Sequence, residues 1–486
     1  QSPSKALWRR DVSMNSRALD TLAGIVAIFG SVFIMFTLGH FYTVGNMSPY
    51  IMSYLRKNVQ PHLKNSDAVW LSAGSLACQG IAMPLSGLLL LKIGFRIIII
   101  CSCMLTSFGL FLSYLSINAG FGSFIFTYAI MVGTGIGSSY GLLLSIGASW
   151  FPKHGGLVVG LLVSGFCAGA IILTPVQTAL INPDNIPINY QTQMFEDDEL
   201  LQRIPRAFLI LGGILASMQL IGCLTVRPRP TNSIPPPDES SVNAEAKTVN
   251  SASSVALEME TSVSPRKLFK MLNLYIFWGV MLLTLIPFTL VSSAMKIVGQ
   301  KTFPDDVFLS IVVTVSAAFN AASRVLWGPL GDSLSFKLPL CINNFFYCAL
   351  LITFPFVSVV SAAGRYLYAI WMILMFICIG GNFVLLPFGV SRAFGQKYFA
   401  INYGIVFTAV TPGSILSAVI VSVVTLEHHT VGIFVGCGCI TFVVGILALL
   451  FMDEQEPSCL KIISWRKREI ESDEVHANDV QLYDAD

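Results

Sequence analysis

The chain has 486 residues, of which 54% are hydrophobic and 12% are charged, and its mean hydropathy is +0.71. Soluble domains carry about 25% charged residues, and half of that charge cannot cover their surface. The composition excludes a disordered protein, a secreted disulfide scaffold and an ordinary cytosolic enzyme. It leaves a membrane protein with several spans. The net charge of +2 gives no reason to expect a nucleic-acid partner.

Apolar runs of about 20 residues predict transmembrane helices, because that length crosses the hydrocarbon core of a lipid bilayer. The runs form two sets of six on either side of a polar stretch. We therefore predict an all-α membrane protein with twelve transmembrane helices in two six-helix bundles. The predicted helices are 21–45, 69–91, 97–117, 121–150, 157–181 and 205–226, then 271–298, 306–331, 338–360, 365–389, 400–425 and 430–452.

The polar stretches divide the chain into five parts. We expect an N-terminal segment 1–20, an N-terminal bundle 21–226, a linker 227–269, a C-terminal bundle 270–452 and a tail 453–486. The linker contains the run RPRPTNSIPPPDESS and further serines, a composition typical of disordered linkers. The linker and tail are places where cytoplasmic partners could bind, and the sequence names none.

The positions of the basic residues predict the orientation. An even number of helices places both termini on one side, and cytoplasmic loops are enriched in Lys and Arg. With the termini inside, 20 of the 29 basic residues fall in inner segments and 7 in outer loops. This asymmetry predicts that both termini and the linker are cytoplasmic. The two remaining basic residues, Lys296 and Arg324, lie within apolar runs.

No pattern points to an enzyme. Ten of the eleven cysteines lie in apolar segments, where a buried thiol acts as a small hydrophobic group, and no CxxC occurs. The six histidines show no metal-ligand spacing, and no nucleophile stands beside a base. We therefore expect no catalytic residue, metal or cofactor.

A short motif recurs after the second helix of each half. The first copy reads GLLLLKIGFR from Gly87, and the second reads GPLGDSLSFK from Gly328. Both resemble the GxLxDxxGx[RK] loop of the major facilitator superfamily, in which the acid and base make cytoplasmic contacts that hold the outward-facing state. The first copy has Leu91 in place of the acid, and the second has Ser335 in place of a glycine. The resemblance implies conformational roles for Gly87, Lys92, Gly94, Arg96, Gly328, Asp332 and Lys337.

Further signatures resemble the oxalate:formate antiporter-like branch of that superfamily, which neighbours the monocarboxylate porters. They include GHFYTVGNMSPY from Gly39, GTGIGSSY from Gly133, WFPKHGGLVVG from Trp150 and NAASR from Asn320. The branch implies a carrier of small carboxylates in which two halves rock around a site near the membrane midplane.

Arg324 is the strongest candidate for binding a carboxylate. It precedes Asp332 at the predicted boundary by 8 residues, which places it about 12 Å inside a core about 30 Å thick. A charge at that depth usually marks a substrate or ion path, and a guanidinium can bind a carboxylate through two hydrogen bonds. The alternative is a structural arginine that pairs with backbone carbonyls or a helix end. The family resemblance implies the same role, because its helix-8 arginine binds the substrate carboxylate.

Three other polar residues lie in predicted helices. Lys296 either faces the cavity or extends to the outer surface. Asn320 lies one helical turn before Arg324, where proton-coupled monocarboxylate porters carry an aspartate, and no acid lies in the interior of a predicted helix. This absence favours exchange or facilitated diffusion over proton symport. His40 is either a packing residue or a group that handles substrate or protons.

The family resemblance also suggests lining residues and one departure. Tyr42 and Tyr140 stand where relatives line the central cavity with aromatic rings. Val410 stands where bacterial oxalate carriers have a second lysine, which favours a monocarboxylate or another small anion without excluding oxalate. Glycines at a spacing of four allow helices to approach closely, and we expect them at the contact between helices 4 and 5; they are Gly133, Gly137, Gly141, Gly165 and Gly169.

The predicted function is a secondary or facilitative carrier of small organic anions such as formate, oxalate, pyruvate or lactate. Anion exchange with Arg324 as the carboxylate site is the leading mechanism. A proton-coupled monocarboxylate symporter that uses His40 is the alternative. A sensor that has the fold but does not transport is a third possibility, in which the linker and tail would carry the interactions.

Overall fold

In the computed structural model, the described residues are 3–187, 189, 194–229, 262–303, 306–357, 364–423 and 430–452. Twelve helices in this part of the chain are long and apolar enough to cross a membrane. No named strand occurs among the described residues, and one isolated bridge joins Asn189 to Met194. The predicted all-α membrane fold is confirmed.

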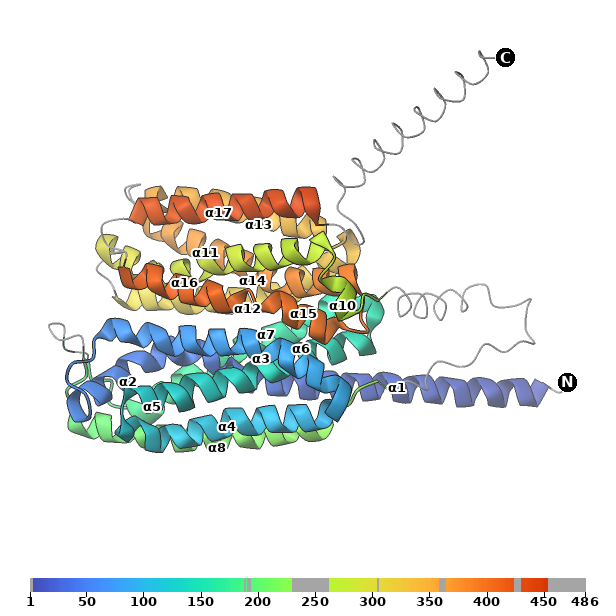
Figure 1. The fold of residues 1–486 in the computed structure, drawn as a ribbon, viewed down its shortest axis with the longest axis horizontal. Helices are drawn as coiled ribbons and strands as arrows, with labels where there is room; N and C mark the ends of the chain where they lie inside the picture. The colour runs from blue at the N-terminus through green and yellow to red at the C-terminus, as the bar shows by residue number, and fades with distance from the viewer. Residues whose placement is uncertain are drawn as a thin grey trace, which may run out of the picture.

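The helices run side by side along the length of the molecule, in two bundles that lie one above the other in Figure 1. The N-terminal half contains α1 (Pro3–Leu38), η1 (Gly39–Thr43), α2 (Val44–Asn58), η2 (Asn65–Ala68), α3 (Val69–Ile93), α4 (Phe95–Ala119), α5 (Phe121–Phe124), the π-helix η3 (Ile125–Met131), α6 (Val132–Trp150), η4 (Pro152–His154), α7 (Gly155–Ile181) and α8 (Asp198–Thr225).

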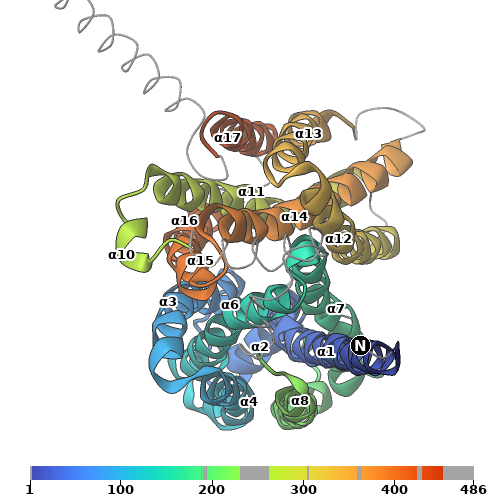
Figure 2. The same cartoon turned by 90° about the vertical axis from the view of Figure 1, so that its right-hand side faces the viewer.

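The C-terminal half contains α10 (Pro265–Leu268), α11 (Leu272–Thr302), α12 (Asp306–Leu334), α13 (Lys337–Val357), α14 (Gly364–Phe394), α15 (Phe399–Phe407), α16 (Val410–Val423) and α17 (Thr430–Phe451). Seen along the helices, α7 lies against α12, and α3 lies against α15 and α16 (Figure 2). These two seams join the halves.

Three elements differ from the sequence prediction. α1 begins at Pro3, and the first span continues without interruption through η1 and α2 to Asn58. The eleventh helix is broken between Phe407 and Val410, where Pro412 has no backbone N–H to bond the carbonyl of Thr408. The last part of the predicted linker is ordered: Val263 donates its N–H to the Phe394 carbonyl at 2.9 Å, and α10 follows.

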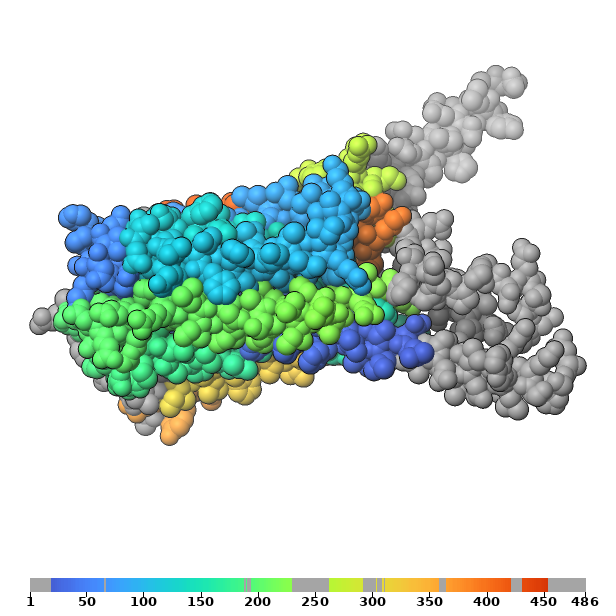
Figure 3. Space-filling model, turned by 90° about the horizontal axis from the view of Figure 1, so that it is seen from below, coloured from blue at the N-terminus to red at the C-terminus, as the bar shows by residue number. Residues whose placement is uncertain are grey.

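The two ends of the bundle differ, and we name them for what they carry. The linker end holds α10 and the starts of α4 and α7; the opposite end holds the end of α2 and the connection between α7 and α8 (Figure 1). The sides between the ends are apolar. α4 and α8 form the outer face in Figure 3, and both expose large hydrophobic side chains along their length, as a lipid-facing surface requires.

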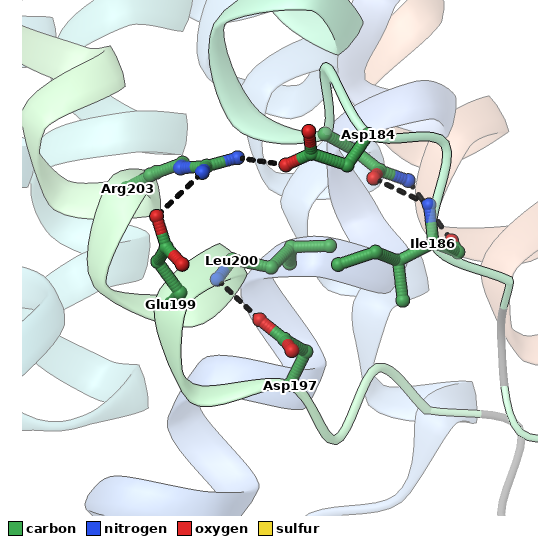
Figure 4. A network of polar contacts seen from close by, with 7 residues as sticks. Asp184, Ile186, Asp197, Glu199, Leu200 and Arg203 are labelled. Atoms are coloured by element: carbon green, nitrogen blue, oxygen red, sulfur yellow. Dashed lines mark hydrogen bonds and ion pairs between the residues drawn. The ribbon is translucent and has the colours of Figure 1, made fainter.

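A polar network folds the connection between α7 and α8 at the opposite end (Figure 4). The Asp197 carboxylate caps α8 by accepting the Leu200 N–H at 2.8 Å. Arg203 binds Asp184 at 3.0 Å and Glu199 at 2.7 Å. These groups all belong to the N-terminal half, so the network stiffens that half without tying it to the other.

The spaced glycines pack against helices other than the expected ones. An added Cβ at Gly133 would lie 2.5 Å from the Ser75 carbonyl oxygen, and one at Gly137 would lie 2.6 Å from Gln79, so this row faces α3; Gly141 follows it with Met83. Gly165 and Gly169 face Val32 and Phe36 of α1. The prediction that these glycines form the contact between helices 4 and 5 is wrong; in that contact Gly147 lies against Leu162. A row of glycines makes a flat helix face without specifying its partner.

Candidate functional site

Arg324 lies in α12 at the seam between the halves, and only 1% of it is exposed. Its Nε donates to Oδ1 of Asn320 at 3.2 Å, one helical turn earlier. Its Nη1 donates across the seam to the backbone carbonyl of Val163 in α7 at 3.3 Å. The guanidinium also stands over the ring of Phe383, 5.1 Å from its centroid. Neutral groups thus hold this charge.

Asn320 is fixed from several directions. Its Nδ2 donates to the Phe376 carbonyl of α14 at 2.6 Å, which leaves Oδ1 as the acceptor that faces Arg324. The same Oδ1 accepts the Cys167 thiol of α7 at 3.4 Å. The amide therefore has one orientation that satisfies both of its ends.

Aromatic rings surround the guanidinium. Tyr42 and Tyr140 both interact with the charge of Arg324. Their rings pack edge-on against Phe166, with centroids 5.1 Å and 5.5 Å away, respectively. Phe288 lies 6.5 Å from Tyr42 and 5.1 Å from Phe383 between ring centroids. The structure thus brings together Arg324, Asn320, Tyr42 and Tyr140, four of the residues for which the sequence suggests a role in binding substrate.

A cavity of about 170 Å³ lies between the halves on the side of the opposite end. α2 and α3 contribute to its wall from the N-terminal half, and α11 and α16 from the C-terminal half. Tyr42 and Phe288 belong both to this wall and to the rings around Arg324. These two rings therefore separate the cavity from the buried charge.

His40 does not join this site. It lies in η1 inside the N-terminal half, where its Nδ1 accepts from Nε2 of Gln177 at 3.1 Å and lies 3.2 Å from the Thr43 hydroxyl. Its ring packs edge-on against Tyr128, which belongs to the π-helix η3. Its described polar partners are neutral and belong to its own half. The side chain of Lys296 lies outside the described residues, and Val410 is buried at the start of α16.

The second copy of the repeated motif closes the seam at the linker end. Oδ1 and Oδ2 of Asp332 accept the N–H groups of Gly156 and Leu157, each at 2.9 Å. The carboxylate therefore caps the first turn of α7, where the free N–H groups and the helix dipole favour an anion. Gly156 and Gly328 touch backbone to backbone beside it.

The first copy meets the C-terminal half through packing. A Cβ at Gly87 would lie 2.9 Å from Cα of Ile401 in α15, and Leu91 is 65% exposed. The three ion pairs of the described residues all lie at the opposite end. Among the described residues, therefore, no ion pair involves the basic residues of the motif, which are Lys92, Arg96 and Lys337.

The seam between α7 and α12 continues from the linker end to the site. Gly160 lies against the backbone carbonyl of Arg324, and the Ser164 hydroxyl donates to the Ala321 carbonyl at 2.8 Å. Any side chain at position 160 would push the two helices apart. The backbone that carries Arg324 is thus held against the other half.

Sequence analysis missed several groups at the site. Val163 contributes a carbonyl, which any residue type would supply, so no sequence signal marks it. Phe166, Phe288 and Phe383 are three of 34 phenylalanines in an apolar chain. The pair Gly380–Gly381 before Phe383 is the one local signal, since Gly380 admits Ser323 and Arg324. Within the described residues, no group of three His, Cys, Asp or Glu could hold a metal.

Comparison with known proteins agrees with this architecture. The Apicoplast pyruvate carrier 1 of Toxoplasma gondii is 25% identical over 79% of this chain and 80% of its own. The Oxalate:formate antiporter of Oxalobacter formigenes is 19% identical over 59% of each chain. The solved structure of the proton:xylose symporter XylE superposes with a TM-score of 0.63 at 12% identity, over 92% of this chain and 99% of that one. These matches confirm the resemblance drawn from the motifs, at the level of the fold for XylE.

The family profile described as the Major Facilitator Superfamily matches residues 21–418. That range covers the N-terminal bundle and the C-terminal bundle as far as α16, and it includes the two motif copies and Arg324. The protein is a transporter in the membrane, not an enzyme. The chain belongs to the Major Facilitator Superfamily.

Proposed function

We propose that this protein carries small monocarboxylates by alternating access, with Arg324 binding the carboxylate. The observation that carries the proposal is a fully buried guanidinium at the seam between the halves that forms no ion pair within the described residues. Burial of an unpaired charge is unfavourable, and a bound carboxylate would supply the missing counter-ion.

The surroundings of Arg324 favour an anion with one charge. The charge of a monocarboxylate matches that of Arg324, the cation described at this site, and the phenyl and phenol rings suit the apolar part of a small organic acid. Val410 supplies no second cation. One relative is named as a pyruvate carrier, and another is named as an oxalate:formate antiporter. We take pyruvate as the first substrate to test.

Anion exchange is the mechanism that these groups support best. Exchange requires that the loaded carrier changes conformation more readily than the empty one, and a substrate that neutralises Arg324 would have that effect. Proton symport requires a titratable group coupled to the site. Asn320 cannot titrate, and His40 is held by Gln177 and Thr43 inside one half.

We further propose that the linker end is cytoplasmic. Described acidic side chains gather at the opposite end, in Asp67, Asp184, Glu196, Asp197, Asp198 and Glu199. Described basic side chains are more numerous at the linker end, in Lys92, Arg96, Lys153, Arg227, Arg229, Arg266, Lys267, Lys270, Lys337, Arg392 and Lys397, than at the opposite end, in Arg56, Lys57, Lys64, Arg203, Arg206 and Arg365. A cytoplasmic side is expected to carry this excess. The closed end would then face the cytoplasm, and the cavity would open outward.

Counter-flow of radiolabelled pyruvate into proteoliposomes tests the proposal. We expect uptake to require unlabelled carboxylate inside, and Arg324→Gln to lower it on the order of 100-fold or more, because a buried charged hydrogen-bonding partner is lost. Arg392→Gln is the matched control, since Arg392 also stands over a phenylalanine ring, that of Phe388 at 5.3 Å. Undiminished uptake by Arg324→Gln, at normal expression, would overturn the assignment of the site.

A further inference from the structure

We infer that Asn320 is a positioning residue whose neutrality is required: it orients Arg324 through Nε and leaves its charge free for the substrate. This inference rests on the proposed role of Arg324. It assigns to Asn320 an action through the guanidinium and not a contact with the substrate.

The amide of Asn320 is held at both ends. Its Nδ2 is committed to the Phe376 carbonyl at 2.6 Å, so only Oδ1 can face the arginine. Oδ1 accepts from Nε at 3.2 Å and from the Cys167 thiol at 3.4 Å. With α14 fixing one end and α7 contacting the other, the oxygen has little freedom to follow a moving guanidinium.

The second step concerns which edge of the guanidinium stays available. The planar guanidinium carries five N–H donors in a fixed fork. Asn320 takes the Nε–H and the Val163 carbonyl takes one Nη1–H, the latter at 3.3 Å across the seam. A carboxylate that binds through both terminal nitrogens therefore has to replace the Val163 contact and the interaction with Tyr42, but not the hydrogen bond to Asn320. Asn320 can keep its hydrogen bond while the substrate is bound.

The third step is the charge of the acceptor. The titratable groups that interact with Arg324 from the packed elements are Tyr42, Tyr140, Cys167 and Tyr403, which are neutral at physiological pH in their ordinary state. A carboxylate at position 320 would keep a hydrogen bond to Nε. It would also act as an internal counter-ion and compete with the substrate at the high effective concentration of a tethered group.

This reasoning predicts an order of variants that shape alone does not. Asp is the closer mimic of Asn in size, so a purely structural role predicts that Asn320→Asp is the milder change and Asn320→Leu the harsher one. Neutral positioning predicts the reverse for substrate affinity. In pyruvate counter-flow at pH 7.5, we expect Asn320→Leu to raise KM about 10-fold and Asn320→Asp to raise it on the order of 100-fold.

Asn343 in α13 provides the matched control. Its Nδ2 donates to the Cys378 carbonyl at 3.0 Å, two residues beyond Phe376 in the same helix, whereas the hydrogen bonds described for Arg324 go to Asn320 and Val163. An aspartate there also faces a carbonyl oxygen, so any cost of that repulsion appears in both pairs. We expect the KM values of Asn343→Asp and Asn343→Leu to lie within about threefold of each other.

The outcomes separate this inference from the proposed function. If Arg324→Gln abolishes uptake but Asn320→Asp has the same KM as wild type or a lower KM than Asn320→Leu, neutral positioning is wrong and the carboxylate site stands. Neutral positioning is equally wrong if the ratio of KM between the Asp and Leu variants is the same at position 320 as at position 343. If Arg324→Gln transports normally, the proposed function itself fails.

A double-mutant cycle covers the case in which Asn320→Asp does not fold. Lysine has no Nε–H at the arginine position, so in the Arg324→Lys background we expect Asn320→Leu to raise KM less than threefold, against about 10-fold in wild type. If Asn320→Leu raises KM by the same factor in the wild-type and Arg324→Lys backgrounds, Asn320 does not act through Arg324.

Discussion

The two copies of the repeated motif do the same job at the linker end with different chemistry. The copy from Gly328 contains a carboxylate, and Asp332 caps the first turn of α7 with two hydrogen bonds of 2.9 Å. The copy from Gly87 has Leu91 at the matching position, and its seam relies on the contact of Gly87 with Ile401. One seam is held by a carboxylate, and the other is closed without a charge.

The difference shows that a repeated fold does not need a repeated latch. Gln396 of the C-terminal half donates to the Ser145 carbonyl at 3.1 Å. A Cβ added at Gly404 would lie 2.7 Å from Cα of Pro84, so the two backbones are in close contact. These contacts close the second seam without a charge. The seam with α7 also holds Arg324, so the polar latch and the proposed site share two helices.

The largest effect is expected from breaking the latched seam sterically. The Cβ of Gly156→Val would overlap the backbone of Gly328, so the linker end could no longer close. We expect a wider spin-label distance between Lys153 and Arg392, and at least a tenfold loss of counter-flow. Gly213→Val is the control, because its Cβ would meet nothing within 4 Å. An unchanged distance would contradict the close seam.

A smaller effect is expected from Asp332→Asn, which keeps the shape of the latch and removes its charge. The lost charge–dipole interaction and one N–H bond correspond to about 1–2 kcal/mol. The same spin labels should report a larger open population at the linker end. Asp198→Asn, in an exposed ion pair with Lys57, should leave it unchanged. Equal shifts for both variants would mean that Asp332 does not latch the seam.

The smallest effect concerns the turn within each copy of the repeated motif. Gly94 and Ser335 occupy the same motif position and both have left-handed backbones, with φ of 79° and 63°. A serine pays a steric cost there that glycine avoids. We expect Ser335→Gly to stabilise the purified protein by about 0.5–1 kcal/mol and Gly94→Ser to destabilise it similarly, measured as shifts of the thermal midpoint. Shifts of the same sign would reject the equivalence of the two turns.

Periodicity and length were enough to predict the twelve spans, because lipid imposes the same apolar run on each of them. They were also enough to single out Arg324, since a charge in an apolar run is rare. The packing partners of individual residues were harder to predict from the sequence. The glycine row at Gly133 specifies a flat face and not the α3 helix that meets it, and the Val163 carbonyl has no side-chain signature. The position of His40 inside one half follows from tertiary packing alone.

The buried guanidinium has an electrical consequence for the proposed cycle. A unit charge that crosses the full membrane potential gains or loses about 2.3 kcal/mol per 100 mV. Arg324 without a bound anion is such a charge, in proportion to the part of the membrane potential that it crosses when the two halves rock. With a monocarboxylate bound, the pair is neutral and the same movement is electrically silent. The return of the empty carrier should therefore sense voltage, whereas one-for-one exchange should not.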